Sequence, residues 1–318
     1  MWRKVCGRRL ISKQEGSGVE YKACPTLEWE TTPALLRAEE MSKGSVERRF
    51  RLVARDLKVL ESLLHYDYLT GRHLQRLAGF RSRAQVADRL AELAGQGLVA
   101  RCRIRVASGR AKFSEYVYAL RRLGAEALVC EGKMDERDFK RWRPVYRQMG
   151  RRLSVPHQLE TADFCLAALE EADRRGMALL WRGSHWAHQF ISSYHAGGHP
   201  LAISPDAVLL GGKAPLLVEM ERSGSVRLAR VREKLGLYRR YFKVPASKAK
   251  YNSRLMYVLY VMEDDATYNL IRHLAMDEKL SWLLMFNARH MAWNVETCGI
   301  LKGDAKSVDL FEQIAPNH

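Results

Sequence analysis

The sequence lacks paired cysteines. Its six cysteines, Cys6, Cys24, Cys102, Cys130, Cys165 and Cys298, are scattered singly, and no Cys-x-x-Cys pair occurs. Zinc knuckles and disulfide frameworks need cysteines at close, regular spacing. Both are therefore excluded, and the pattern suits a reducing compartment.

Long apolar runs are also absent. No run approaches the length that spans a bilayer, and residues 1–16 lack the apolar core of a signal peptide. We therefore expect a cytoplasmic protein with no membrane partner. A phosphate-cradling glycine-rich loop is missing too, because Ala207 and Ala214 stand where that loop around Gly212-Lys213 would need a glycine and a hydroxyl residue.

Acidic residues are too few to balance the basic ones. Among 318 residues, 53 are Lys or Arg and 36 are Asp or Glu, which gives a formal net charge of +17. Such an excess favours a polyanionic partner, with nucleic acid ahead of an anionic membrane surface. The length allows two domains with cores of their own.

The pattern of charge, glycine and periodicity divides the chain into five segments. We expect a flexible basic arm at 1–48, a first domain at 49–130, a linker helix at 131–153, a second domain at 154–290 and a tail at 291–318.

The first domain has the pattern of three short helices followed by a two-stranded ribbon. Thr70 and Ser82 are good N-caps for the second and third helices. A glycine-containing turn at 107–112 separates the two strands. The expected elements are helices at 53–64, 71–78, 83–94 and 122–130 and strands at 98–106 and 115–120.

This order is that of a winged helix-turn-helix, whose third helix enters the major groove. Residues 50–122 hold 15 Lys and Arg against 6 Asp and Glu, so positive charge is concentrated there. Arginine and glutamine can read guanine and adenine edges, and basic side chains on the wing suit phosphates. The alternative is a winged helix that only contacts proteins. The predicted DNA-binding residues are Arg81, Ser82, Arg83, Gln85 and Arg89 on the third helix and Arg103, Arg105, Arg110 and Lys112 on the wing.

The second domain centres on residues 204–242, which indicate strand, turn, strand and helix. Gly211-Gly212 suits a two-residue hairpin turn between strands at 207–210 and 216–221. Side chains alternate along a strand, so Glu219 and Glu221 share one face. Asp206 could converge with them.

Two carboxylates on one face beside an apolar run need a positive partner, and Asp206 would make a third. Their oxygens suit a hard cation such as Mg²⁺ or Mn²⁺, and Lys234 on the following helix could reach them or a bound phosphate. The helix should pack through Leu228, Val231, Leu235, Tyr238 and Phe242. The alternative is a structural strand whose surface acids pair with arginines.

The order Pro205-Asp206, hairpin, Glu-x-Glu and a helix with Lys-x-x-x-Tyr resembles the PD-(D/E)xK nuclease superfamily. The resemblance implies that Asp206 and Glu219 are metal ligands. It also implies a lysine at position 221, where Glu221 stands instead, and Lys234 is a candidate substitute. The predicted catalytic residues are Asp206, Glu219, Glu221 and Lys234, and the predicted metal ligands are Asp206, Glu219 and Glu221.

A histidine-rich stretch at 185–199 precedes this region. It contains His185, His188, His195 and His199, without a cysteine and without the spacing of a zinc motif. Zinc ligands, a phosphate-contacting loop and plain surface histidines are the three interpretations.

Seven motifs follow one another along the chain: DLKVLESLLHYDYLTGRHLQRLAGF, RLAELAGQGLVARCRI, YVYALRRLGAEAL, His157, Pro205-Asp206, LLVEMERSGS and KLGLYRRYF. In this order they resemble the replication-relaxation family of plasmid and mobile-element proteins. The resemblance implies an α/β protein with an α+β N-terminal domain: a winged helix-turn-helix followed by a restriction-endonuclease-like mixed sheet flanked by helices.

Three functions follow as hypotheses. The first is a sequence-selective double-stranded DNA-binding protein in the replication, mobilisation or transfer of a plasmid or mobile element, acting with replication or transfer machinery. The second is a metal-dependent DNA endonuclease targeted by its winged helix. The third is a transcription regulator with a ligand-sensing second domain. A homodimer on a palindromic site is an open alternative, although no coiled-coil repeat enforces one.

Overall fold

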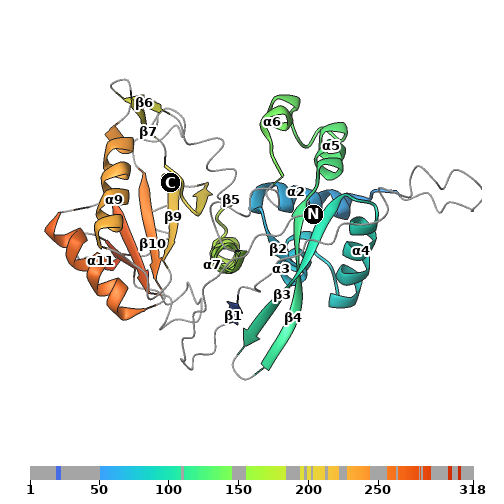
Figure 1. Ribbon diagram of the computed structural model, residues 1–318, viewed down its shortest axis with the longest axis horizontal. Helices are drawn as coiled ribbons and strands as arrows, with labels where there is room; N and C mark the ends of the chain where they lie inside the picture. The colour runs from blue at the N-terminus through green and yellow to red at the C-terminus, as the bar shows by residue number, and fades with distance from the viewer. Residues whose placement is uncertain are drawn as a thin grey trace, which may run out of the picture. The chain divides into compact units, whose positions relative to one another are not determined.

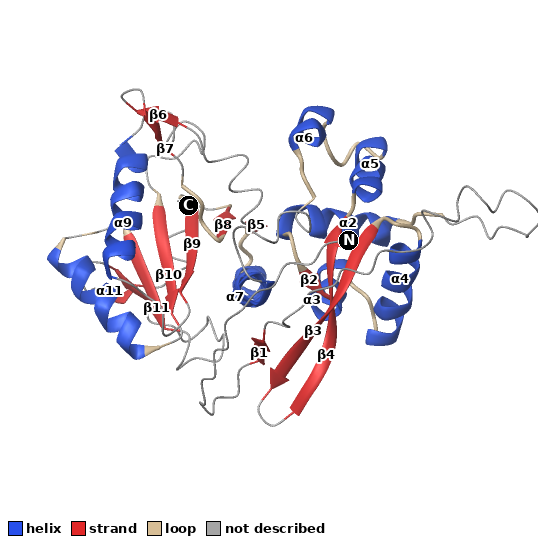
Figure 2. Cartoon of the chain, viewed as in Figure 1, coloured by secondary structure: helices blue, strands red, loops and turns tan. Residues whose placement is uncertain are grey.

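The computed structural model divides into two compact units, Met1–Ala162 and Asp163–His318, each described by itself. Figure 1 shows the helices and strands of both units, and Figure 2 separates them by type. The residues described are 19–22, 51–108, 111–144, 155–183, 194–196, 199–201, 203–211, 214–221, 228–243, 256–262, 264–278, 280, 282–287, 300–302 and 307–308.

The first unit contains the predicted helices, which are α2 (Ala54–Tyr66), α3 (Gly71–Ala78), α4 (Arg83–Gly95) and α5 (Arg122–Cys130). The two predicted N-caps are confirmed. The Thr70 hydroxyl accepts a hydrogen bond from the His73 amide at 3.4 Å, and Ser82 Oγ accepts one from the Gln85 amide at 3.2 Å. Each bond satisfies an amide that the first turn of a helix leaves without an intrahelical partner.

The sheet of this unit has the order β1 (Val19–Lys22), β3 (Val99–Ser108), β4 (Ala111–Leu120), β2 (Leu69–Thr70), with antiparallel pairing throughout. Strands β3 and β4 are longer than the sequence predicted. Ala107 pairs with Lys112 and Ser108 with Ala111, so the expected turn at 107–112 is largely strand. Within the expected basic arm at 1–48, β1 is the part that the structure describes.

The core of the first unit forms where the helices meet the inner face of the hairpin. Helix α2 packs against α3, α5 and β4, and α4 packs against α3 and β3. Leu60, Leu74 and Leu90 are fully buried, each on a different helix, and Cys102 and Val117 are fully buried on the hairpin. Val53, the first residue of the helix expected at 53–64, is half exposed, because it precedes the first turn of α2.

Of the expected linker at 131–153, the structure describes residues 131–144. They contain one short helix, α6 (Glu136–Arg141), which the Asp135 side chain caps. Trp142, which directly follows it, is buried. Helix α7 (Val155–Arg174) then runs across the boundary between the two units.

The second unit is built on a seven-stranded mixed sheet. Strands β9, β10 and β11 are parallel, and the neighbours on both sides are antiparallel. The sheet order is β13 (Ser307–Val308), β12 (Ile300–Lys302), β11 (Leu283–Asn287), β10 (Tyr257–Met262), β9 (Leu216–Glu221), β8 (Ala207–Leu210), β5 (Leu180–Gly183). A separate hairpin joins β6 (Tyr194–Ala196) and β7 (His199–Leu201).

Helices α9 (Leu228–Lys243) and α11 (Asp265–Asp277) cover one face of this sheet, as Figure 1 shows. Their buried side chains join those of alternate strand residues in one apolar cluster, because successive residues of a strand point to opposite faces. The predicted inward face of α9 is confirmed at Val231, Leu235 and Tyr238. Tyr241 is also fully buried there, a position that the sequence pattern missed.

Two connections differ from expectation. The link between β8 and β9 spans residues 211–215, so it is not a two-residue turn, although Gly211 has the positive φ of 129° that was expected for a glycine. A Cβ at Gly211 would lie 2.1 Å from the Ala178 carbonyl oxygen, which explains the glycine independently of the turn type. In the expected tail at 291–318, β12 and β13 extend the sheet.

Candidate functional site

The carboxylates of Asp206 and Glu219 are brought together by the pairing of β8 with β9. Ala207 pairs with Val218, so Asp206 lies beside the segment that holds Glu219. The Asp206 amide donates to the Val218 carbonyl oxygen at 2.9 Å, and Asp206 Oδ2 accepts from the Met220 amide at 2.8 Å. These two bonds fix the Asp206 side chain at the sheet.

Glu219 is the centre of a polar cluster inside an apolar layer. Its side chain is fully buried and accepts hydrogen bonds from Lys234 Nζ and from the Tyr238 hydroxyl, both on α9. Lys234 and Tyr238 are one helical turn apart, so both can face the same carboxylate. The sequence prediction that Lys234 reaches the acidic residues is confirmed.

Glu221 lies at the rim of this cluster. Its Oε1 is 4.0 Å from Lys234 Nζ, and its side chain is 24% exposed. Contact of Glu219 and Glu221 with the same ammonium confirms that both side chains leave β9 on one face. We call Asp206, Glu219, Glu221, Lys234 and Tyr238 the carboxylate cluster.

The cluster carries more negative than positive charge. Burial raises the pKa of Glu219 to about 8, and the nearby Asp206 adds to this, against the lowering effect of Lys234 and of the Tyr238 hydrogen bond. Burial alone would lower the pKa of Lys234, but the charges of Glu219 and Asp206 outweigh it and raise that pKa. One ammonium therefore does not fully offset burial and the neighbouring carboxylate at Glu219.

Oxygen ligands of this kind suit Mg²⁺ or Mn²⁺ in chemical type. As arranged, however, Lys234 already supplies the positive charge at Glu219. Within the described part of the chain, no three His, Cys, Asp or Glu side chains form a group that could hold a metal ion. The present arrangement of these residues therefore does not fit a metal centre, and the assignment of Asp206, Glu219 and Glu221 as metal ligands stays a prediction.

The first unit contains the other predicted site. Arg81, Ser82, Arg83 and Gln85 are all exposed, at the entrance to α4 and on its first turn. On the opposite side of the helix, Val86 and Leu90 are buried. The N-terminal turn of α4 thus presents polar side chains to solvent from a helix anchored in the core.

Arg89 has a different place from the one predicted. Its Nε donates to Asp56 Oδ1 at 2.7 Å, its Nη2 to Asp56 Oδ2 and to the Arg51 carbonyl oxygen, and its Nη1 to Glu92. Asp56 is fully buried and also accepts from the Val53 amide at 2.8 Å. These bonds tie α4 to the start of α2, so the geometry gives Arg89 a structural role that the sequence pattern missed.

The basic residues expected on the hairpin are only partly described. Arg103 is exposed on β3, and its guanidinium carbon lies 5.0 Å from the centre of the Tyr116 ring. The side chains of Arg105, Arg110 and Lys112 lie outside the described residues, as does the histidine-rich stretch apart from the backbone of His195 and His199.

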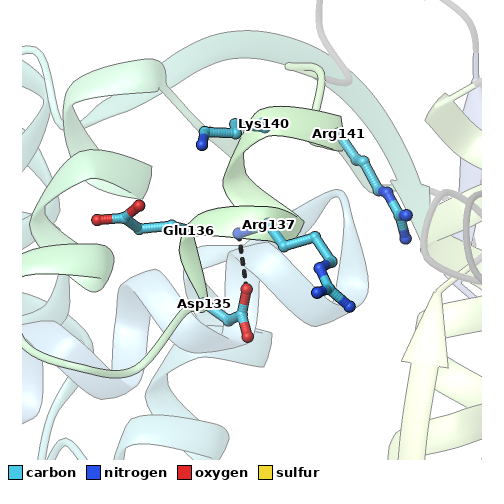
Figure 3. A pocket seen from close by; sticks show the side chains of 5 residues that line it. All are labelled: Asp135, Glu136, Arg137, Lys140 and Arg141. Atoms are coloured by element: carbon cyan, nitrogen blue, oxygen red, sulfur yellow. Dashed lines mark hydrogen bonds between the residues drawn. The ribbon is translucent and has the colours of Figure 1, made fainter.

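An open depression lies around α6 and is lined by Asp135, Glu136, Arg137, Lys140 and Arg141, as Figure 3 shows. Asp135 Oδ1 accepts from the Arg137 amide at 2.6 Å, which is an ordinary helix cap. Charged side chains of both signs line the depression and no apolar side chain is among them, so it lacks the features of a small-molecule pocket.

None of the helices in the described part of the chain combines the length and apolar character that crossing a bilayer requires. Comparison with curated proteins and with solved structures yields no match. The model of the replication-relaxation family matches residues 60–255, which include α4, the β3–β4 hairpin and the carboxylate cluster. This match covers well over half of the 318 residues, and the chain therefore belongs to the replication-relaxation family.

Proposed function

We propose that this protein binds double-stranded DNA sequence-selectively and acts in the replication, mobilisation or transfer of a plasmid or mobile element. Membership of the replication-relaxation family supports the biological setting. In this proposal the first unit is a winged helix-turn-helix, α4 is its recognition helix and the β3–β4 hairpin is its wing.

The observation that carries the proposal is the exposed N-terminal turn of α4. A recognition helix reads base edges mainly with its first residues. Arg83 and Gln85 are exposed there, and arginine and glutamine can make paired hydrogen bonds to guanine and adenine, respectively. Arg81 and Ser82 flank them at the helix start, where phosphate contacts are favourable.

The bond network of Arg89 supports this use of α4. A helix that reads bases must be held in a defined orientation, because a hydrogen bond to a base edge tolerates little displacement. The Arg89–Asp56 pair joins residues that are far apart in sequence and fixes α4 against α2. Arg89 thus serves as a positioning residue for the exposed turn.

The hairpin supplies a second basic element. Arg103 is exposed on β3, Arg105 and Lys112 belong to β3 and β4, and Arg110 falls between the two strands in the sequence. Basic residues on such a ribbon contact phosphates and so position the duplex without reading its sequence. In Figure 1 the far end of the hairpin extends beyond helices α2, α3 and α4.

The test is a comparison of sequence preference and affinity, using duplex fragments from the protein's own genetic neighbourhood. Arg83→Ala should remove the preference at one base position, which is worth about 1–3 kcal/mol. Lys112→Ala should weaken all sequences alike and reduce the salt dependence. Arg137→Ala, which removes an exposed arginine of α6 in the same unit, is the matched control and should change neither. Equal affinity of the wild type and Arg83→Ala for every fragment would refute the proposal.

A metal-dependent endonuclease is the second candidate. It is favoured by the contact of Glu219 and Glu221 with Lys234 and by Asp206, which is bonded to the same strand through the Met220 amide. A Mg²⁺ or Mn²⁺ ion would compete with Lys234 for Glu219, and it would supply Lewis acid chemistry for phosphodiester hydrolysis. Full burial of Glu219 weighs against this candidate, since a phosphate would have to reach it.

Supercoiled DNA separates the two candidates. Protein is mixed with the DNA in the presence of Mn²⁺ or EDTA, and both retardation and nicking are scored. Retardation without nicking is expected for a DNA-binding protein. Nicking that needs the metal and disappears in Glu219→Gln would establish the nuclease. The third hypothesis, a ligand-sensing regulator, gains no support from the charged depression at α6.

A further inference from the structure

The outward face of the β3–β4 stem carries a compact group of planar side chains. Arg101 and Arg103 lie on β3, and Tyr116 lies opposite Arg103 on β4. The guanidinium carbons of both arginines are 5.0 Å from the centre of the Tyr116 ring. We call Arg101, Arg103 and Tyr116 the stem face.

Strand alternation explains why these side chains share one face. The intervening residues Cys102 and Ile104 on β3 and Val117 on β4 are buried in the core. Arg103 is exposed, and Arg101 and Tyr116 are partly exposed. The stem face is therefore the solvent side of a hairpin whose other side is fixed by the core.

The ring of Tyr116 is supported from one side. Tyr118, two residues along β4, is buried, and the centres of the two rings are 6.3 Å apart with an interplanar angle of 45°. A guanidinium over an aromatic ring is attracted to the electrons of the ring face. Tyr116 thus holds two positive, planar groups close together, although their like charges repel.

We infer that the stem face binds single-stranded DNA, and this inference rests on the proposed function. Unpaired bases offer π-faces that stack on tyrosine rings and guanidinium planes, and the strand carries phosphates that two adjacent arginines attract. A duplex offers this flat face only phosphates, because its bases are stacked on one another. The first unit then reads duplex with the N-terminal turn of α4 and holds unpaired strand on the stem face, and Arg103 contacts phosphates of either form.

The experiment measures binding of the full chain to a labelled oligothymidylate of about 12 nucleotides and to a duplex of similar length. Tyr116→Leu removes the aromatic face but keeps an apolar side chain, and it should weaken single-strand binding about tenfold. Tyr116→Phe keeps the ring and should stay within about twofold of the wild type. Duplex affinity should change by less than about twofold in both variants.

Arg103→Gln provides an independent variant at an exposed position, where folding is not at risk. It should weaken single-strand binding about threefold to tenfold and reduce the salt slope by about 1. An equal loss of duplex and single-strand affinity in Tyr116→Leu would overturn the inference in favour of a shared phosphate contact. Unchanged single-strand affinity in both Tyr116→Leu and Arg103→Gln would overturn it as well.

Different results would refute the proposed function and the inference about the stem face. Arg83→Ala should alter duplex recognition and leave oligothymidylate affinity unchanged within about twofold, because α4 and the stem face are separate surfaces. A chain that binds oligothymidylate through Tyr116 but shows no sequence preference on duplex would retain the inference about the stem face and refute selective duplex binding.

Discussion

In the described part of each unit, a completely buried carboxylate pairs with a cation from a helix, yet the two pairs are balanced differently. In the first unit Asp56 meets Arg89, and in the second Glu219 meets Lys234. Asp56 accepts two bonds from one guanidinium and one from the Val53 amide. Glu219 shares the single ammonium of Lys234 with Glu221, whose Oε1 is 4.0 Å from Lys234 Nζ. The charge of Asp206 also acts on that ammonium.

The difference shows how to distinguish a structural ion pair from a site whose negative charge is only partly compensated. Arginine binds a carboxylate with two parallel bonds, and Arg89 makes two to the buried Asp56 while its Nη1 bonds the exposed Glu92. In the carboxylate cluster, burial raises the pKa of Glu219 to about 8 and the nearby Asp206 adds to this, against the lowering effect of Lys234. Excess negative charge of this kind is common at functional sites as well as in structural networks.

The largest loss of stability is expected when the pair of Arg89 and Asp56 is broken. Arg89→Ala leaves the fully buried Asp56 without its guanidinium and should reduce the free energy of unfolding by about 3–5 kcal/mol. Urea unfolding measures this change. Arg83→Ala, which removes an exposed arginine from the same helix, should change stability by no more than about 0.5 kcal/mol. A loss of stability in Arg83→Ala as large as that in Arg89→Ala would contradict the structural role of Arg89.

Breaking the pair of Lys234 and Glu219 should lower the free energy of unfolding by a smaller amount. Lys234→Met removes the ammonium, but Glu219 can remain neutral by keeping its proton, so we expect a loss of about 1–2 kcal/mol at neutral pH. The same unfolding experiment measures it. A cost equal to that of Arg89→Ala would show that Glu219 is charged at neutral pH and that the two pairs are alike.

The pH dependence of stability sharpens the comparison. The folded pKa of Glu219 is about 8, whereas its ordinary value is 4.5, so between these values the folded state holds a proton that the unfolded chain has released. The stability from this proton is complete below the ordinary value and is lost as pH rises toward 8. Glu219→Gln should flatten the fall in the free energy of unfolding across about pH 5 to 8. An unchanged slope in this variant would assign the dependence to other groups.

The smallest effect is expected from the tyrosine. Tyr238→Phe removes the hydroxyl that donates to Glu219 but keeps the ring in the core, so the loss should be about 0.5–1.5 kcal/mol. Tyr241→Phe, on the same helix and equally buried, is the matched control for removal of a hydroxyl from the core. A pKa of Glu219 that falls in Tyr238→Phe, measured by NMR titration, would contradict the proposed hydrogen bond, because its loss should raise that pKa further.

Much of the local structure could be predicted from the sequence. Apolar spacing and the hydroxyls of Thr70 and Ser82 located α3 and α4 to within a residue, because helix periodicity and N-capping depend on neighbours within one turn. The alternation of Glu219 and Glu221 likewise followed from strand geometry alone. The reach of Lys234 was predicted from its place on the border of the apolar face of α9.

The tertiary structure decided which residues far apart in the sequence come into contact. Arg89 and Asp56 are 33 positions apart, and neither the helix pattern nor the charge of Arg89 distinguishes a base-reading arginine from one that braces two helices. The Arg101–Tyr116–Arg103 group depends on strand register, which the longer hairpin set. The addition of β12 and β13 to the sheet depends on edge pairing, which leaves little trace in a short sequence.

The sequence by itself thus determined the elements and their polar faces, because these arise from interactions over a few residues. Packing decided which polar groups meet, because burial and pairing are properties of the whole fold.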